Sequence, residues 1–332
     1  MAERIQLAHG GGGTLMQQLI DQELRALYAD PAQVLHDAAL LQVPPGPLAF
    51  STDGYVVQPL EFPGGNIGSL AVIGTANDLA MAGARALHLS VAMILEEGLP
   101  LEVLRRVVAA LAAAARPCGL TIVTGDTKGG ERGKGDGVFL TTSGIGLVEA
   151  PEPIDPHAIR PGDQLLVSGD LGRHGVAILA ARHGLDLVPP VLSDCAPLWP
   201  QVRELLAAGV RIHCLRDLTR GGLASALQEL AVAAGVELAI EEACLPVAEP
   251  VARTCELLGF EPLHLANEGR FVAVVPPEAA DRARALLAAG GGAWIGTVRP
   301  ATGAGGRVLL TTALGTERLL IPLSGELLPR IC

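Results

Sequence analysis

Hydrophobic residues recur along the first half of the chain in two alternating patterns. Residues 14–28 and 101–116 carry apolar side chains at helical spacing, and residues 69–83 are rich in Ala and Leu, which also favours a helix. Short apolar runs typical of strands lie at 48–52, 87–95, 120–124 and 138–147. The pattern therefore predicts strands and helices in alternation.

The stretch Pro151–His157 holds three prolines in seven residues and predicts a domain boundary, because proline disfavours both helix and strand. After it, helices are expected at 173–183, 197–208, 222–235, 249–258 and 278–288. Strands are expected at 164–168, 211–215, 236–241, 270–275 and 307–322. This alternation predicts an α/β (α+β) fold with domains at 1–150 and 151–323, followed by a flexible C-terminal tail at 324–332.

The composition is typical of a folded chain with two domains. Its 332 residues are 49% hydrophobic and 18% charged, a balance that excludes intrinsic disorder. No apolar run reaches the roughly 18 residues that a membrane-spanning helix needs, and the N-terminus lacks the basic and apolar regions of a signal peptide. We therefore expect a cytoplasmic protein with no membrane partner.

The net charge argues against a nucleic-acid partner. There are 24 Lys and Arg against 35 Asp and Glu, a formal charge of −11. An acidic chain is poorly suited to a phosphate backbone, and 2 Trp, 2 Tyr and 5 Phe are too few to suggest a platform for stacking bases.

Three aspartates lie near the ends of apolar segments: Asp53, Asp78 and Asp126. Strand ends and the loops after them are where such folds place ligand groups. Carboxylates suit Mg²⁺, which would offset the repulsion between an acidic protein and the phosphates of a nucleotide. Each aspartate could instead be a turn residue or a helix cap.

Four glycines directly precede the first expected helix: Gly10, Gly11, Gly12 and Gly13. Glycines allow a backbone to approach a ligand closely, and a helix N-terminus offers unpaired N–H groups to a phosphate. A flexible N-terminal arm would have the same sequence. Lys128, two residues after Asp126, could neutralise a phosphate oxygen.

The six cysteines form no Cys-x-x-Cys pair, which argues against a zinc ribbon or a thioredoxin-like site. Five are expected to be buried small apolar residues: Cys118, Cys195, Cys214, Cys244 and Cys255. Cys332 differs because it is the last residue of a nine-residue tail that can extend about 30 Å. Its thiol could reach a site on this chain or on a partner, with Arg330 favouring the thiolate, or it could be incidental.

Several segments along the chain form a specific combination. They are Leu7–Gly13, Phe62–Gly68, Gly74–Asp78, Ile94–Pro100, Val123–Lys128, Arg216–Gly222, Asn267–Gly269 and Pro329–Cys332. Together they resemble the HypE family of hydrogenase maturation proteins, in the superfamily of aminoimidazole-ribonucleotide synthetase-like (PurM-like) ATP-binding enzymes. The resemblance covers nearly the whole chain.

The resemblance implies a PurM-like fold of two domains, whose N-terminal domains pair into a homodimer around a β-barrel with flanking helices. HypE-like proteins accept a carbamoyl group on the terminal cysteine from a HypF-type carbamoyltransferase. With ATP and Mg²⁺ they dehydrate it to a thiocyanate. The cyano group then passes to iron held by a HypC–HypD complex and becomes a cyanide ligand of the [NiFe]-hydrogenase centre.

The chemistry of the residues agrees with this reaction. An amide oxygen leaves poorly, whereas a phosphorylated one leaves as phosphate, so the reaction needs Mg·ATP, a cation to stabilise developing charge and a base. The resemblance implies metal ligands at Asp53, Asp78 and Asp126, and Lys128 at the phosphate or the developing oxyanion. The glycine segment would close over the nucleotide.

Further residues are implied by the same motifs. Asn77 and Thr127 would lie beside the nucleotide, and Thr219 and Arg220 would add phosphate contacts. Glu268 is a candidate base, or alternatively a structural carboxylate. His9 and His174 are further candidates, and each is also explained as a structural residue. Cys332 and Arg330 complete the catalytic set.

The sequence departs from the family pattern at a few loop positions, with Gly11, Arg173 and Arg270 where Ser, Asp and Lys are common. Two other functions stay open. A sister synthetase, such as a selenophosphate synthetase, would carry its reactive Cys or selenocysteine near the N-terminal glycines, whereas the first cysteine here is Cys118. A non-catalytic ATP-binding scaffold for the maturation partners would bind ATP without thiol-dependent turnover.

Overall fold

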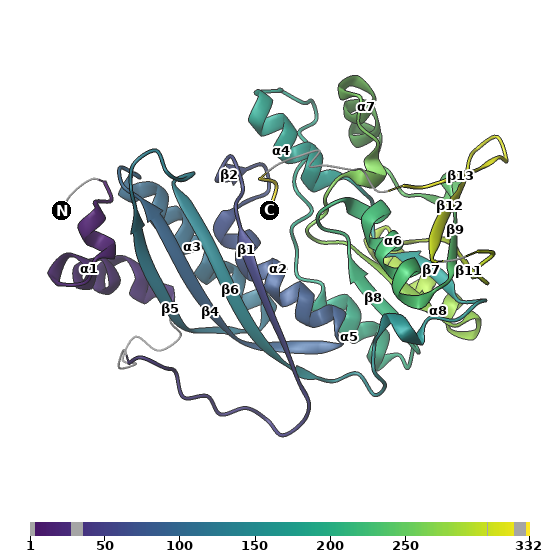
Figure 1. Cartoon of the computed structure of the whole chain (residues 1–332), viewed down its shortest axis with the longest axis horizontal. Coiled ribbons are helices and arrows are strands. Elements are labelled where there is room, and N and C mark those ends of the chain that lie inside the picture. The colour runs from purple at the N-terminus through teal and green to yellow at the C-terminus, as the bar shows by residue number, and fades with distance from the viewer. Residues whose placement is uncertain (1–3, 28–35, 304, 322–329) are drawn as a thin grey trace. The chain divides into compact units, whose positions relative to one another are not determined.

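The computed structural model describes residues 4–27, 36–303, 305–321 and 330–332 (Figure 1). The chain forms two compact units. Unit 1 comprises Met1–Leu79, Ala84–Glu149 and Cys332, and unit 2 comprises Ala80–Gly83 and Ala150–Ile331. Both contain helices packed on a sheet, which confirms the expected mixed fold. Among the described residues, no helix is both long and apolar enough to cross a bilayer.

Unit 1 is built on a four-stranded sheet in the order β1-β6-β4-β5. Its strands are β1 (Leu48–Tyr55), β4 (Ala84–Glu96), β5 (Thr121–Gly130) and β6 (Val138–Val148). Only the β4–β5 pair is parallel, and β1 and β5 form the two edges. A small hairpin of β2 (Glu61–Phe62) and β3 (Gly65–Asn66) lies outside this sheet.

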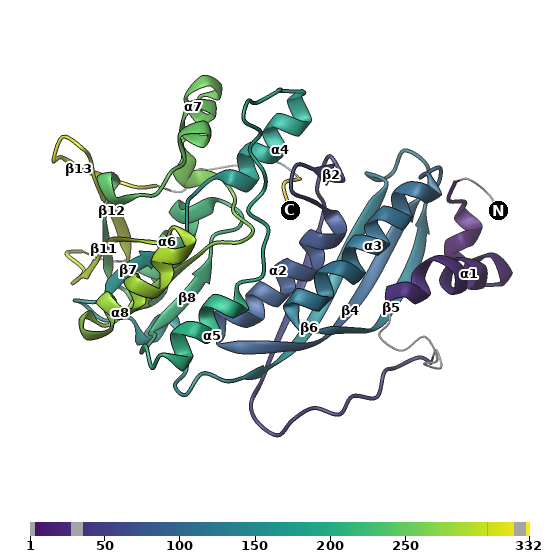
Figure 2. The same cartoon turned by 180° about the vertical axis from the view of Figure 1, so that it is seen from behind.

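Two helices cover one face of this sheet, as Figure 2 shows. They are α2 (Ile67–Met81) and α3 (Leu101–Cys118). Helix α3 begins after Pro100 and ends at Gly119, whose φ of +68° suits glycine. It buries Leu104, Val107 and Leu111 against the unit, as its apolar stripe predicts. Both helices were expected, with ends displaced by only a few residues.

The N-terminal segment differs from the single helix expected at 14–28. It runs as a short α-helix, α1 (Thr14–Leu19), then a π-helical turn (Ile20–Leu24) and a 3₁₀ turn (Arg25–Leu27). The π turn contains Glu23, whose carboxylate is only 8% exposed and accepts two hydrogen bonds of 2.9 Å from Arg105 of α3. The change from α-helix to π-helix thus occurs where Glu23 bonds to Arg105 of α3.

Unit 2 contains a seven-stranded sheet in the order β13-β12-β9-β11-β7-β10-β8. The strands are β7 (Gln164–Val167), β8 (Cys214–Asp217), β9 (Glu237–Glu241), β10 (Phe271–Val275), β11 (Ala293–Arg299), β12 (Arg307–Thr311) and β13 (Glu317–Leu319). The helices are α4 (Arg173–His183), α5 (Trp199–Ala207), α6 (Gly222–Ala234), α7 (Glu249–Leu258) and α8 (Pro277–Leu287). Only β9–β12 is parallel.

Short 3₁₀ turns also occur in both units, at Leu7–Gly10, Pro156–Ala158, Glu242–Cys244, Pro262–His264 and Ala288–Gly290.

The core of unit 2 lies on both faces of its sheet. Leu165, Val272 and Val274 contribute to one cluster, and Leu166 and Ala273 to the other. This alternation along β7 and β10 leaves both strands buried on both sides.

Candidate active site

Asp53 and Asp126 do not lie at strand ends, so that expectation was wrong for these two, whereas Asp78 lies in the helix expected at 69–83. Asp53 lies inside β1, Asp126 lies inside β5, and Asp78 lies inside α2. Ser51, two residues before Asp53 and therefore on the same face of β1, donates a 2.6 Å hydrogen bond to Asp78 Oδ2. Asp53 and Asp78 thus belong to the helix-covered face.

Asp126 is separated from this pair. Asp53 is paired with Thr142 of β6, and Asp126 is paired with Ala92 of β4, so two strands lie between the two carboxylates. Three strand spacings amount to about 14 Å. Among the described residues, no group of three or more His, Cys, Asp or Glu side chains is placed to hold a metal ion.

Asp126 instead pairs with Lys128, two residues along the same strand face. Lys128 Nζ lies 2.9 Å from Asp126 Oδ2, and both side chains are largely exposed. The hydrogen bond from Lys128, together with one from the Thr127 backbone, holds the pKa of Asp126 below its usual value despite a small opposing effect of burial. The pair therefore presents a carboxylate and an ammonium group side by side.

The glycine segment lies against Lys128 and Gly129. A Cβ atom on Gly10 would fall 1.8 Å from the Gly129 nitrogen and 2.6 Å from the Lys128 carbonyl carbon, so only glycine fits there. Gly12 and Gly13 have φ values of +82° and +85°, a region that favours glycine. The structure thus brings the glycine segment beside the strand that carries Lys128.

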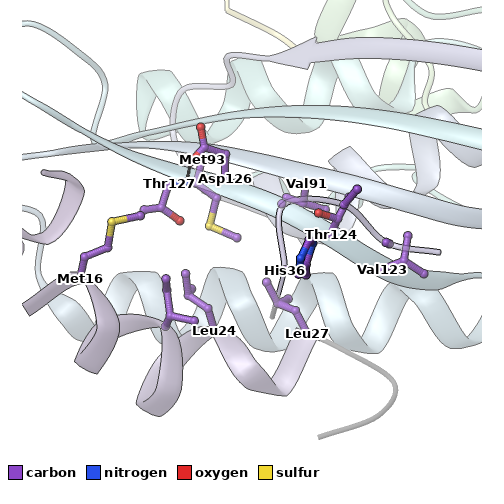
Figure 3. A pocket seen from close by; sticks show the side chains of 14 residues that line it. Met16, Leu24, Leu27, His36, Val91, Met93, Val123, Thr124, Asp126 and Thr127 are labelled. Carbon is purple, nitrogen blue, oxygen red and sulfur yellow. Dashed lines mark hydrogen bonds between the residues drawn. The ribbon is translucent and has the colours of Figure 1, made fainter. Parts of the chain in front are cut away.

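A cavity of about 150 Å³ lies between the N-terminal helical segment and β4 and β5 (Figure 3). Met16 and Leu24 point from the helical segment toward Val91 and Met93 of β4. Thr127, a buried residue paired with Met93, faces the same side and supplies a hydroxyl group. Apolar walls with a few polar groups are typical of small-molecule binding sites.

Other lining residues of this cavity were not predicted to be functional. They include Met16, Ile20, Leu24, Leu27, His36, Val91 and Met93. All of these except His36 are apolar, as ordinary core residues are, so their helical and strand periodicity was the available signal. Asn77, predicted to lie beside the nucleotide, is buried within α2.

The terminal residue belongs to unit 1. The backbone N–H of Val56 donates a 3.1 Å hydrogen bond to a main-chain oxygen of Cys332. Val56 directly follows β1, and it lies three residues after Asp53. The residue that carries the candidate thiol is therefore held at the end of the strand that carries a candidate metal ligand.

In unit 2, Thr219 and Arg220 lie in the turn between β8 and α6. Gly221 and Gly222 follow with φ values of +75° and +60°. A Cβ on Gly222 would lie 2.5 Å from the Leu265 carbonyl oxygen, so this turn also requires glycine. Arg220 is exposed, which leaves its guanidinium accessible to an anion.

Glu268 is buried, and its backbone is bound by Asp194, a residue that the sequence analysis did not identify. Asp194 accepts hydrogen bonds from the backbone N–H groups of His174 (3.1 Å), Glu268 (3.3 Å) and Gly269 (3.1 Å). Glu268 itself is only 3% exposed. A lone aspartate in an irregular segment carries no local pattern, so Asp194 could not have been singled out.

The remaining candidates are placed as follows. His9 Nδ1 accepts a 2.9 Å hydrogen bond from the Gln6 backbone, a local contact that explains it as a structural residue. Arg330 has an exposed side chain and a φ of +58°. Cys118, Cys214 and Cys255 are buried as expected, whereas Cys195 and Cys244 are partly exposed, which corrects the expectation for those two.

Comparisons with known proteins agree with this architecture. Models of AIR synthase related proteins match residues 35–148 (N-terminal domain) and 160–308 (C-terminal domain). Carbamoyl dehydratase HypE of Rhodobacter capsulatus is 49% identical over 337 residues, covering 99% of this chain and 98% of that protein. The protein of the same name from Escherichia coli K12 is 45% identical and covers 99% of both chains.

Solved structures of the same family superpose closely. A crystal structure of hydrogenase maturation protein HypE in complex with ATP has a TM-score of 0.94 and 44% identity, covering 98% of this chain and 99% of that one. HypE in a HypE–HypF complex has a TM-score of 0.78 and 42% identity, covering 82% and 89%. Identity at this level along nearly the full length of both proteins shows that the chain belongs to the HypE family of carbamoyl dehydratases, within the AIR synthase related (PurM-like) proteins.

Proposed function

We propose that this chain uses ATP to dehydrate a carbamoyl group carried on the sulfur of Cys332, in the maturation of [NiFe]-hydrogenase. The amide oxygen attacks the terminal phosphorus of ATP and the amide nitrogen gives up one of its two protons, which releases ADP and leaves an O-phosphorylated thioimidate. Loss of the remaining N–H proton to a base and of phosphate from carbon then forms the C≡N bond of a thiocyanate. Full-length identity to carbamoyl dehydratases, together with a terminal cysteine, supports this reaction.

The nucleotide is assigned to unit 1. The cavity beneath the N-terminal helical segment has apolar walls that suit a purine ring, and Thr127 supplies a polar group there. The segment Gly10–Gly13 lies beside Lys128 and offers a side-chain-free backbone to the phosphates. The similarity to a HypE crystallised with ATP supports this assignment.

A magnesium ion is assigned to Asp53 and Asp78, because hard carboxylate oxygens on one face of the sheet suit this cation. When bound, it would neutralise phosphate charge and orient the triphosphate. Asp126 does not fit the same ion within one chain, because two strands separate it from Asp53. A second copy of the chain could supply it.

The roles of the other residues are assigned by chemistry. Lys128 stabilises the negative charge that develops on the transferred phosphoryl group, and Arg220 and Thr219 add anion contacts. Glu268 accepts the proton from the carbamoyl nitrogen, for which a buried carboxylate is well suited. Arg330 favours the Cys332 thiolate when the carbamoyl group is first loaded.

A homodimer is supported by an apolar face of the unit 1 sheet. Phe50 is 70% exposed, and Leu48 and Ile94 are also exposed. The registers place Phe50 opposite Ile145 of β6 and Ile94 opposite Phe139, two residues of one face of β6. Covering this face with the same face of a second copy would close two sheets into the barrel that the family resemblance implies.

The partners are assigned by analogy with relatives. The solved HypE–HypF complex favours a HypF-type carbamoyltransferase as the donor. A HypC–HypD complex is proposed as the acceptor of the cyano group.

The deciding experiment is intact-mass analysis of the protein carbamoylated at Cys332. We expect Mg·ATP to remove the mass of one water from the C-terminal peptide, and Cys332→Ala to abolish thiocyanate formation while keeping ATP affinity. If the carbamoylated protein binds ATP but keeps its mass, the chain is a non-catalytic ATP-binding scaffold.

A further inference from the structure

Side chains of α4 hold the last residues of unit 2 through their backbone. The Ile331 carbonyl oxygen accepts a 2.8 Å hydrogen bond from His174 Nε2, and the Arg330 carbonyl oxygen accepts one of 3.0 Å from Arg182 Nη2. The Ile331 side chain is only 6% exposed. Two successive peptide groups and one apolar side chain are therefore bound at one place.

The protonation of His174 follows from its partners. Its ring is fully buried, and Nδ1 lies 2.9 Å from Ser193 Oγ. A carbonyl oxygen can only accept, so Nε2 carries the hydrogen, and Nδ1 accepts from the Ser193 hydroxyl. Burial lowers the pKa of His174, although the Ile331 hydrogen bond and Asp194 oppose the shift, and the ring is accordingly neutral.

The backbone of His174 is fixed as well. Asp194 Oδ1 accepts a hydrogen bond from the His174 N–H, and the next residue, Gly175, donates to the Ala266 carbonyl oxygen. The ring is therefore held from both its backbone and its Nδ1 side. Because the ring is already held in place, binding a ligand does not require further ordering of His174. This is what makes a binding group preorganised.

A second buried histidine makes the same type of contact with the C-terminal segment. His264 Nε2 lies 3.2 Å from the Ile321 carbonyl oxygen. Ile321 is the last described residue before Arg330. His264 and His174 thus each contact a backbone carbonyl group of unit 2, that of Ile321 and that of Ile331.

We propose that His174, Ser193 and Arg182 form a peptide-binding seat for the C-terminus of the chain, and that His174 is a positioning residue for the reaction at Cys332. The seat recognises two peptide carbonyl groups and the apolar side chain at position 331. The positioning role rests on the proposed dehydratase function, whereas the seat itself does not.

The seat is tested by carboxypeptidase digestion of the full chain, with release of Cys332 and Ile331 followed by intact mass. Each rate is normalised to that of the same protein unfolded in denaturant, which removes the preference of the protease for particular residues. His174→Leu is expected to speed release about tenfold, the change expected from the loss of one net hydrogen bond. An unchanged rate overturns the seat.

Two further variants separate the seat from a general loss of structure. His174→Gln keeps an N–H donor close to the position of Nε2 and is expected to restore slow release. His183→Gln changes an exposed histidine of the same helix and is expected to match the wild type. If His174→Leu does not fold, Ile331→Ala tests the same seat from the tail, and release at the wild-type rate overturns it.

The positioning role is tested by single-turnover dehydration of the carbamoylated protein. His174→Leu is expected to slow this step about tenfold while ATP affinity stays within about twofold, and His174→Gln is expected to recover part of the rate. An unchanged rate in His174→Leu overturns the positioning role. If the wild type itself loses no water, the proposed function fails, and the digestion result still decides the seat.

Discussion

Asp53 and Asp126 lie on the two edge strands of one four-stranded sheet, with β6 and β4 between them. Oxygen ligands of one Mg²⁺ lie within about 4 Å of each other, whereas three strand spacings are about 14 Å. If both aspartates serve the same ion, they therefore come from different copies of the chain.

This geometry predicts complementation between two inactive variants. Asp53→Asn and Asp126→Asn should each abolish dehydration, and mixing them by co-refolding should restore about a quarter of the wild-type activity, because a mixed dimer has one site with both aspartates intact. The measurement is ATP-dependent thiocyanate formation in the mixture. If the mixture stays inactive, the two aspartates either have separate roles or act in a site formed by a single chain.

Gly10→Ala should weaken ATP binding about tenfold or more with little change in the unfolding transition. The added Cβ meets the backbone of Lys128 and Gly129, so the glycine segment must move away from β5. Gly130→Ala is the matched control, because its nearest neighbour would be Ile94 at an ordinary 3.7 Å. Calorimetric titration with ATP compares the two, and equal affinities would exclude the segment from the site.

Glu23→Gln should lower the free energy of unfolding by about 1–3 kcal/mol. The carboxylate is nearly buried and accepts both hydrogen bonds from Arg105, which holds the π-helical turn against α3. Glu102→Gln, an exposed neighbour of Arg105, should change stability by much less. Denaturant unfolding measures both variants, and similar losses would contradict the special role of Glu23.

Alkylation of the folded protein near pH 8 should leave three cysteines unmodified. Burial raises the pKa of Cys118 and Cys214 to about 12 and that of Cys255 to about 11, so the reactive thiolate is scarce until the solution is far more alkaline. The partly exposed Cys332 should react first among these four. Peptide mass mapping checks the order, with denatured protein as the reference in which all react.

Much of the fold could be predicted because local signals mark it. Helices 173–183 and 249–258 were predicted with both ends correct, since glycines with positive φ follow them at Gly184 and Gly259. Strand β11 was missed because a bulge between Trp294 and Gly296 interrupts its alternation. The strand expected at 307–322 is two strands, separated by a turn with Gly315 at φ +77°.

The site was predictable only in part, for a physical reason. Gly10 and Lys128 could be proposed together because both residue types suit a phosphate, and the fold does place them side by side. The contact between His174 and Ile331 spans 157 positions and depends on the course of the backbone. No local pattern of residues encodes such a contact, so only the structure could show it.

Arg330 is the one described non-glycine residue with a positive φ, a conformation that costs an arginine about 1–2 kcal/mol. The free energy of binding at the seat has to offset this conformational cost, which is recovered when the tail leaves. The tail therefore dissociates more readily than its hydrogen bonds alone would suggest. The group of residue 330 that Arg182 binds is its backbone carbonyl oxygen, so this contact recognises the peptide chain. The last residues of the chain can therefore bind through their backbone and still be released.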